Sequence, residues 1–184
     1  MRFAGDELGT GTAVQARGES GRKIIIRPEL PSDSAAVVKV IEQAFGRKDE
    51  ARLVERRRAE GDAVISLVGV LEDGVVSHVM LSRLTAPFPA LALAPISVTP
   101  DHQGRGVGSR LVEEALKQAR ARGWEGVFVL GDPVFYRRFG FRLDLAVGFS
   151  SPYAGPHFMA LPLGQSLPAS SGTIAHAPAF VDLG

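Results

Sequence analysis

Between residues 91 and 130, an apolar strand, a glycine-rich turn, an amphipathic helix and a second apolar strand follow one another directly. Two strands of one sheet that are joined by a single crossover helix run parallel. The helix returns the chain to the end of the sheet at which the first strand began, so the second strand runs in the same direction. This unit therefore predicts a parallel pair, residues 91–98 beside residues 127–130. The helix between them ends at Gly123 and presents one apolar face, formed by Val107, Leu111, Val112, Ala115, Leu116 and Ala119.

The rest of the chain predicts antiparallel strands and further helices around that unit. Two β-rich runs meet at Glu72, Asp73 and Gly74, a combination typical of a hairpin turn. The predicted fold class is α+β (mixed α/β), with a mixed, mostly antiparallel sheet, a parallel central strand pair and flanking helices. The other expected elements are a strand over residues 23–30, a helix from residues 32–34 to Gly46, a charged helix over 49–60, a helical turn over 134–139 and a strand near 157–163.

Length and composition exclude several classes of protein. The 184 residues suit one domain, placed at residues 23–184 behind a flexible leader of residues 1–22. A net charge of +1 gives no broad attraction to nucleic acid, and the absence of cysteine excludes disulfides, thiolate catalysis and sulfur-ligated metals. No apolar run reaches the ~20 residues of a membrane span, and the histidines show no metal-ligand spacing. We therefore expect a cytoplasmic protein without metal, membrane or nucleic-acid partners, with a homodimer as one candidate assembly.

Three glycines, Gly104, Gly106 and Gly108, stand at the mouth of the predicted helix. The first N–H groups of a helix have no partner within it, and the helix dipole makes this end partly positive. Glycines there allow several N–H groups to converge on one anion, and Arg105 and Arg110 add positive charge. A tight turn with positive φ angles explains one glycine more readily than three. The pattern thus indicates a phosphate or pyrophosphate site.

Two common phosphate-binding patterns fit this loop poorly. No glycine here precedes the Lys-Ser or Lys-Thr pair of a Walker loop. A dinucleotide fingerprint starting at Gly104 would need glycine where Ser109 stands, although Asp132 could imitate its ribose-binding acid. The preceding strands also form a hairpin meander in place of repeated βαβ units. A nucleotide-binding oxidoreductase is therefore the weaker interpretation.

A third pattern, [RQ]-x-x-G-x-[GA], is met by Gln103, Gly106 and Gly108. The run around it, APISVTPDHQGRGVGSRLVEEALKQARARG, resembles the acyl-CoA-binding motif of the GNAT superfamily of N-acyltransferases. The order of the expected elements from residue 23 onward also resembles the fold of that superfamily.

A second motif lies downstream. The run FYRRFGF resembles the superfamily's Tyr-x-x-x-Gly-Phe signature, with Tyr136, Gly140 and Phe141 in register. Within the superfamily the chain is similar to a bacterial group of predicted N-acetyltransferases, over about residues 23 to 180. The two motifs together are far more specific than either alone.

The resemblance implies an enzyme that moves the acetyl group of acetyl-CoA to an amine of a small molecule or a protein by direct attack. The pantetheine arm would lie between two splayed parallel strands, and the pyrophosphate would lie on the glycine loop. The backbone N–H of Val98 would stabilise the oxyanion, and Tyr136 would donate a proton to the departing thiolate. The implied cofactor contacts are Ile96, Ser97 and Val98 on the strand, and Gln103, Gly104, Arg105, Gly106, Val107, Gly108, Ser109 and Arg110 on the loop and helix.

The general base is the part of the chemistry that the sequence leaves open. An amine with a pKa near ~10 is almost entirely protonated at pH 7, so some group has to accept its proton. His78 is one candidate, although it also fits a strand histidine that is bonded to a neighbour, and His102 is expected to be a solvated turn residue. The remaining candidates are Asp49, Glu50 and Asp132.

Two departures from the superfamily pattern support a second hypothesis. Many members carry a carboxylate on the strand before the glycine loop, and residues 91–98 contain none. Val129 stands where the superfamily frequently has asparagine, seven residues before Tyr136. A non-catalytic acyl-CoA-binding sensor or regulatory module therefore remains the alternative to an enzyme. The tyrosine in its expected register favours the enzyme.

Overall fold

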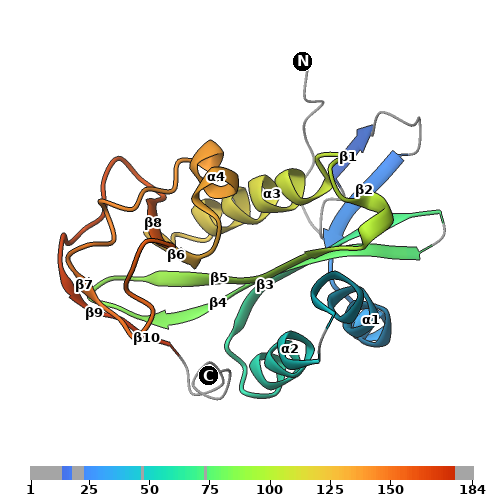
Figure 1. The fold of residues 1–184 in the computed structure, drawn as a ribbon, viewed down its shortest axis with the longest axis horizontal. Coiled ribbons are helices and arrows are strands. Elements are labelled where there is room, and N and C mark those ends of the chain that lie inside the picture. Colours follow the sequence, from blue (N-terminus) through green and yellow to red (C-terminus); the bar gives the residue numbers. More distant parts are fainter. Residues whose placement is uncertain (1–13, 18–22, 47, 73, 177–184) are drawn as a thin grey trace.

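The structure of the chain is a computed structural model that describes residues 14–17, 23–46, 48–72 and 74–176 (Figure 1). Its helices are η1 (Pro31–Asp33), α1 (Ser34–Phe45), α2 (Asp49–Ala59), η2 (Pro100–His102), α3 (Val107–Ala121), α4 (Pro133–Tyr136) and η3 (Arg137–Phe139). Its strands are β1 (Val14–Arg17), β2 (Lys23–Pro28), β3 (Ala63–Leu71), β4 (Gly74–Thr85), β5 (Ala90–Val98), β6 (Gly126–Leu130), β7 (Phe149–Ser150), β8 (Phe158–Pro162), β9 (Gly172–Thr173) and β10 (Ala175–His176).

One large sheet organises the described part of the chain. Its strands follow the order β1, β2, β3, β4, β5, β6 and β8, and β10 also pairs with β4. Within this sheet, β5 and β6 are the one parallel pair among the described residues, and the other pairs are antiparallel. The predicted mixed, mostly antiparallel sheet with a parallel central pair is therefore confirmed. A separate small sheet joins β7 and β9 in parallel.

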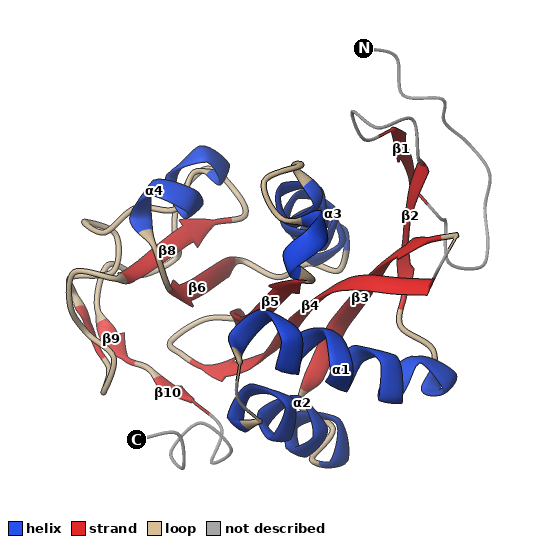
Figure 2. Cartoon of the chain, turned by 45° about the vertical axis from the view of Figure 1, so that its right-hand side comes forward, coloured by secondary structure: helices blue, strands red, loops and turns tan. Residues whose placement is uncertain are grey.

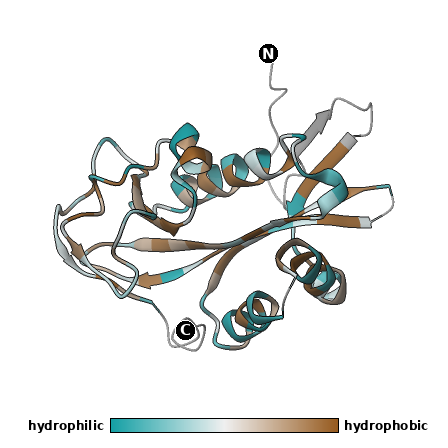
Figure 3. Ribbon diagram, viewed as in Figure 1, coloured by the Kyte–Doolittle hydropathy of each residue, from teal (hydrophilic) through white to brown (hydrophobic). Residues whose placement is uncertain are grey.

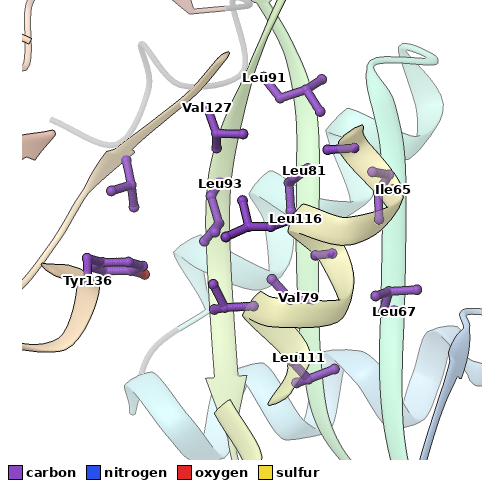
Figure 4. Close-up of a cluster of buried hydrophobic side chains, with 14 of the residues drawn as sticks. Ile65, Leu67, Val79, Leu81, Leu91, Leu93, Leu111, Leu116, Val127 and Tyr136 are labelled. Carbon is purple, nitrogen blue, oxygen red and sulfur yellow. The ribbon is translucent and has the colours of Figure 1, made fainter. Parts of the chain in front are cut away.

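Helix α3 connects β5 to β6 and covers one face of the sheet (Figure 1). It packs on a cluster that includes Val79 and Leu81 of β4 and Leu93 of β5, which Figure 4 shows. Each aliphatic side chain buried in this way contributes about 1.5–3 kcal/mol, so the contact fixes α3 on the sheet. Its buried residues are those that the periodicity predicted: Val107, Leu111, Val112, Ala115, Leu116 and Ala119.

Helices α1 and α2 cover the opposite face (Figure 1). Gly46 ends α1 at a φ of +71° and donates its N–H to Glu42 O across 2.8 Å, which confirms the predicted stop. Figure 3 shows hydrophobic residues along the central strands and hydrophilic ones on the outer side of α2. No helix in the described part of the chain is long and apolar enough to cross a membrane. The core on this face contains Val37, Ile41, Ala51, Val54, Val68 and Met80.

Several short strands were not predicted from the sequence. Strand β1 lies within the segment expected as a leader and pairs antiparallel with β2; residues 1–13 and 18–22 of that segment lie outside the described residues. Strands β7, β9 and β10 are each two residues long. A strand of two residues is too short to show an alternating pattern of apolar and polar residues. It forms because it pairs with a strand that is distant in the sequence.

Candidate active site

Strands β5 and β6 pair only at their beginning. Three residue pairs join them, the last between Ala92 and Phe128, and no further pair follows among the described residues. Strand β5 continues to Val98 with β4 on its other side, so its later residues have an open edge towards β6. Figure 2 shows β6 and β8 set apart from β3, β4 and β5, with α4 beside them.

A β-bulge in β5 lies just beyond the point where the two strands part. Leu81 of β4 pairs with Leu93 of β5, and Val79 of β4 pairs with Ile96 of β5. Between these two pairs β4 has one residue and β5 has two, so β5 holds one extra residue. Pro95 stands in this stretch and has no N–H to donate to a neighbouring strand. Because a bulge bends a strand and interrupts pairing, the sequence of β5 itself favours the separation of β5 from β6.

The main-chain groups of Ile96 and Val98 face the open edge. Thr99 donates its N–H to Val76 O of β4 across 2.9 Å. Successive residues of a strand direct their main-chain groups to opposite edges, so Val98 and Ile96 direct theirs away from β4. Ser97 directs its main-chain groups towards β4. Of the three strand residues expected to contact a cofactor, Ile96 and Val98 therefore present main-chain groups on the open edge.

The loop after β5 contains two residues in the left-handed conformation. Gly104 has a φ of +71° and Gly106 a φ of +76°, and this conformation costs other residues about 1–2 kcal/mol. A Cβ atom at either position would meet nothing within 4 Å, so the backbone angle is what requires glycine. Turn geometry therefore accounts for two of the three glycines, one more than the sequence suggested.

The N–H groups of residues 104–109 have no main-chain acceptor within the described part of the chain. Gln103 donates its N–H to Pro100 O, and the next N–H with a main-chain acceptor is that of Arg110, which donates to Gly106 O; both distances are 3.2 Å. The N–H groups between them include the first turn of α3, at the positive end of the helix dipole. A cluster of donors at a helix N-terminus fits an anion with several oxygen atoms.

Gly108 brings three elements together. A Cβ atom there would lie 3.5 Å from Ile96 Cδ1, 3.6 Å from Val98 Cγ2 and 3.7 Å from Phe135 Cζ. The first turn of α3 therefore lies against the end of β5 and against α4, which also carries Tyr136. The predicted strand and the glycine loop thus meet α4, the helix that carries Tyr136.

Tyr136 is buried at the end of α4, whose first turn is capped by the Asp132 carboxylate accepting the N–H of Val134 across 2.9 Å. Its ring packs edge-on against Phe135 and Phe141, with centroids 5.0 and 5.5 Å apart. Burial raises the pKa of the Tyr136 hydroxyl above its ordinary value, so this group stays protonated at neutral pH.

The hydroxyl of Tyr136 has no hydrogen-bond partner among the described residues. Figure 4 shows its oxygen directed towards the strand that carries Leu93. Gly131 makes room for the ring, because a Cβ atom there would lie 2.4 Å from Tyr136 Cε2. The glycine after β6 is a site residue that the sequence reasoning missed, and its position five residues before Tyr136 gave no signal of this contact.

The candidate bases lie in different surroundings. Asp132 already serves as the cap of α4, and Asp49 lies with Glu50 in the first turn of α2. His102, expected as a solvated turn residue, is half-buried and has its Nδ1 atom 2.8 Å from Thr99 Oγ1. His78 is fully buried on β4, next to the carboxylate of Glu29. Glu29 was not among the candidates, because only the pairing of β2 with β3 and of β3 with β4 brings it next to His78.

Comparison with known protein families matches residues 62–143 to an acetyltransferase (GNAT) domain. The uncharacterized N-acetyltransferase YjhQ of Escherichia coli is 34% identical over 153 residues, which cover 78% of this chain and 84% of that protein. The uncharacterized N-acetyltransferase YhbS of the same organism is 32% identical over 124 residues, 65% of this chain and 74% of that protein.

Solved structures agree in fold. A GNAT family acetyltransferase from Brucella melitensis, crystallised with acetyl-CoA, has a TM-score of 0.74 and 33% identity over 85% of this chain and 97% of its own. YhbS from Escherichia coli, crystallised with CoA, has a TM-score of 0.81 and 25% identity over 98% of both chains. The fold is thus that of GNAT family acetyltransferases. The chain belongs to the GNAT family of acetyltransferases.

Proposed function

We propose that the chain transfers the acetyl group of acetyl-CoA to an amine of a small molecule or a protein, with the co-substrate held between β5 and β6. One observation carries this proposal: the N–H groups of residues 104–109 have no main-chain acceptor among the described residues, and Gly108 lies against Ile96 and Val98 at the open edge of β5. A pyrophosphate with an extended amide-bearing arm is a ligand that fits both features. The co-substrate seen with the Brucella relative has this chemistry.

The pyrophosphate is assigned to the loop and the first turn of α3. The N–H groups of Gly104, Arg105, Gly106, Val107, Gly108 and Ser109 supply donors, and the Arg105 and Arg110 guanidinium groups supply charge. Gln103 shapes the entry to the loop by donating from Nε2 to the Val98 carbonyl across 2.9 Å. The pantetheine amides pair with main-chain groups of Ile96 and Val98, as a peptide does at a sheet edge, and Ser97 lines the same segment.

The acetyl transfer follows from the same geometry. The neutral amine attacks the thioester carbonyl carbon, and the N–H of Val98 on the open edge stabilises the negative charge that develops on the carbonyl oxygen. The carbon–sulfur bond then breaks, and Tyr136 donates its proton to the CoA thiolate. The tyrosine recovers a proton from the new amide nitrogen, so that the acetylated amine and CoA leave the site.

Thiol release from acetyl-CoA in the presence of a panel of primary amines tests this function. We expect release by the protein with at least one class of amine, and none without an amine. Calorimetry with acetyl-CoA and NAD should give binding of acetyl-CoA alone. Binding without thiol release from any amine would favour the sensor module, and a preference for NAD would overturn the assignment of the glycine loop.

A further inference from the structure

A buried polar cluster lies on the sheet face opposite α3. It contains Glu29 after β2, Ser66 of β3, His78 of β4 and Arg58 of α2. The Glu29 N–H donates to Ser66 O across 3.0 Å, which holds the two residues together. Arg58 donates to one carboxylate oxygen of Glu29, and the Ser66 hydroxyl donates to the other. The carboxylate is therefore held from two sides, and His78 is fully buried beside it.

The hydrogen bonds of this cluster define the tautomer of His78. Its Nε2 atom lies 2.9 Å from Ser66 Oγ and 3.4 Å from Glu29 Oε2. Since the single hydroxyl proton of Ser66 is donated to Glu29, Ser66 Oγ can only accept from the histidine. Both neighbours of Nε2 are therefore acceptors, and Nε2 carries the proton. The other ring nitrogen, Nδ1, is left with a free lone pair.

The Nδ1 lone pair lies near the proposed co-substrate strand. His78 faces Ser97 of β5 directly in the strand register, which brings opposite Cβ atoms to about 4.5–5.5 Å. His78 Nδ1 and Ser97 Oγ are both buried, and neither has a hydrogen-bond partner among the described residues. The two atoms are therefore not hydrogen-bonded to each other in this structure. A turn of the Ser97 side chain about its Cα–Cβ bond moves the hydroxyl, and a hydroxyl turned towards Nδ1 would donate to the Nδ1 lone pair.

The surroundings of His78 favour its neutral form, which is the form with a lone pair that can accept a proton. Burial lowers the pKa of His78, Arg58 lowers it further, and Glu29 opposes the shift. Burial alone would raise the pKa of Glu29, but the contacts with His78, Ser66 and Arg58 lower it overall. Glu29 is thus a carboxylate at neutral pH and stabilises the positive ring that protonation creates.

We propose that His78 accepts the proton of the attacking ammonium group through the hydroxyl of Ser97, with Glu29 as the residue that positions and stabilises the ring. This inference rests on the proposed function. With the Ser97 hydroxyl turned towards the ring, the ammonium N–H bond breaks and its proton passes to Ser97 Oγ, while the Ser97 proton passes to His78 Nδ1. The neutral amine then attacks the thioester, and His78 returns its proton to water after the product leaves.

The placement of the two proton-transfer groups agrees with this direction of attack. Side chains alternate along a strand, so His78 and Ser97 lie on the face opposite Val79 and Ile96. Tyr136 and Val79 belong to the hydrophobic cluster beneath α3, and Ile96 packs against that cluster. The proton of the ammonium group is therefore removed by Ser97 and His78 on one face of the sheet. Tyr136 donates a proton to the sulfur of CoA from the other face.

The dependence of kcat on pH tests the inference, with acetyl-CoA and the best amine of the panel. In the wild type, kcat should be level above pH ~7, where His78 is neutral. It should fall at pH values below the ordinary histidine pKa of ~6.5, where His78 becomes protonated. In His78→Gln, kcat at pH 7 falls about 10²-fold or more and follows the fraction of neutral amine. It then rises about tenfold per pH unit from pH 7 to 9 for an amine with a pKa near ~10. Glu29→Gln should give the same trend with a smaller loss.

Ser97→Ala keeps the test decisive if His78→Gln fails to fold, because it removes one hydroxyl only. We expect a kcat at pH 7 lowered by at least about tenfold, the same rise towards pH 9, and an acetyl-CoA affinity within about twofold of the wild type. Ser82→Ala is the matched control, because Ser82 is another buried serine, on β4, outside the cluster; its pH profile should equal that of the wild type.

Each outcome decides between two claims. A wild type that neither binds acetyl-CoA nor releases thiol overturns the proposed function together with this inference. An active wild type with unchanged pH profiles in His78→Gln and Ser97→Ala overturns the inference alone. Acetylated Ser97, detected by mass spectrometry after incubation with acetyl-CoA, would also overturn it, because the serine would then be a nucleophile.

Discussion

The side-chain amide of Gln103 donates a hydrogen bond to the main-chain carbonyl of Val98 across 2.9 Å. This bond joins the glycine loop to the end of β5, so that the proposed pyrophosphate and pantetheine contacts keep a fixed relation. It uses one of the two lone pairs of the Val98 carbonyl and leaves the Val98 N–H facing the open edge. The bond therefore links the cradle for the cofactor to the donor proposed for the oxyanion.

Gln103→Ala should weaken acetyl-CoA binding. The net contribution of one such hydrogen bond is about 1 kcal/mol, which corresponds to about a fivefold change in affinity. Calorimetric titration measures this change. Gln118→Ala is the matched control, because the side chain of Gln118, among the described residues, bonds only to Glu114 within α3 and to Arg122 at the end of α3. Equal affinities of the two variants would refute a role of Gln103 in shaping the loop.

Gly104→Ala should impair both the fold and the binding site. Gly104 has a φ of +71°, which costs an alanine about 1–2 kcal/mol in stability. If the loop relaxes to relieve this strain, the N–H groups of the loop no longer converge, and we expect a loss of about tenfold in acetyl-CoA affinity. Gly123→Ala, at a φ of +79° after α3, separates the two effects. It should lose similar stability in thermal unfolding and keep full affinity in calorimetry; a parallel loss of affinity would count against the cradle.

Tyr136→Phe should lower turnover well over tenfold and leave acetyl-CoA affinity within about twofold. Phenylalanine keeps the ring contacts with Phe135 and Phe141 and removes only the proton donor. Because burial raises the pKa of Tyr136, the wild type should lose no activity through this group as the pH rises to about 10. Steady-state thiol release measures both effects. Tyr153→Phe, the change at the other tyrosine of the chain, should keep turnover within about twofold, and near-normal turnover of Tyr136→Phe would exclude it as the acid.

Gly131→Ala should displace the Tyr136 ring, since the new Cβ atom would lie 2.4 Å from its Cε2 atom. Overpacking of this kind costs about 1–3 kcal/mol, and a misplaced hydroxyl should lower kcat by about tenfold or more. Thermal unfolding and thiol release report the two effects. Gly164→Ala has no atom within 4 Å of its Cβ position and should change neither. A fully active Gly131→Ala would show that the ring position is not critical.

The crossover unit could be predicted because its signals are local. The apolar face of α3, its glycine stop and the strands on both sides are each encoded within a few neighbouring residues, and the structure places β5 within one residue of the predicted start. Pro95 is a further local signal in the sequence. A proline in a central strand indicates a bulge, and the bulge lies next to the point where β6 departs.

The cluster around His78 could not be predicted in the same way. Glu29, Ser66 and His78 come from three different parts of the chain, and only the antiparallel registers of β2, β3 and β4 bring them together. A shift of register by one residue would turn every side chain of a strand to the other face. Sequence spacing therefore carries no information on this contact, whereas it does predict the glycine loop.

Calorimetric titration with acetyl-CoA of the wild type, Gly106→Glu and Gly123→Glu tests directly whether the glycine loop binds the pyrophosphate. Gly106 lies in the loop at a φ of +76° and Gly123 beyond α3 at +79°, so the two variants carry the same charge and similar backbone strain. We expect the wild type and Gly123→Glu to bind acetyl-CoA and Gly106→Glu not to bind it, because a carboxylate in the loop repels the pyrophosphate. Undiminished binding by Gly106→Glu, or no binding by the wild type, would contradict this expectation.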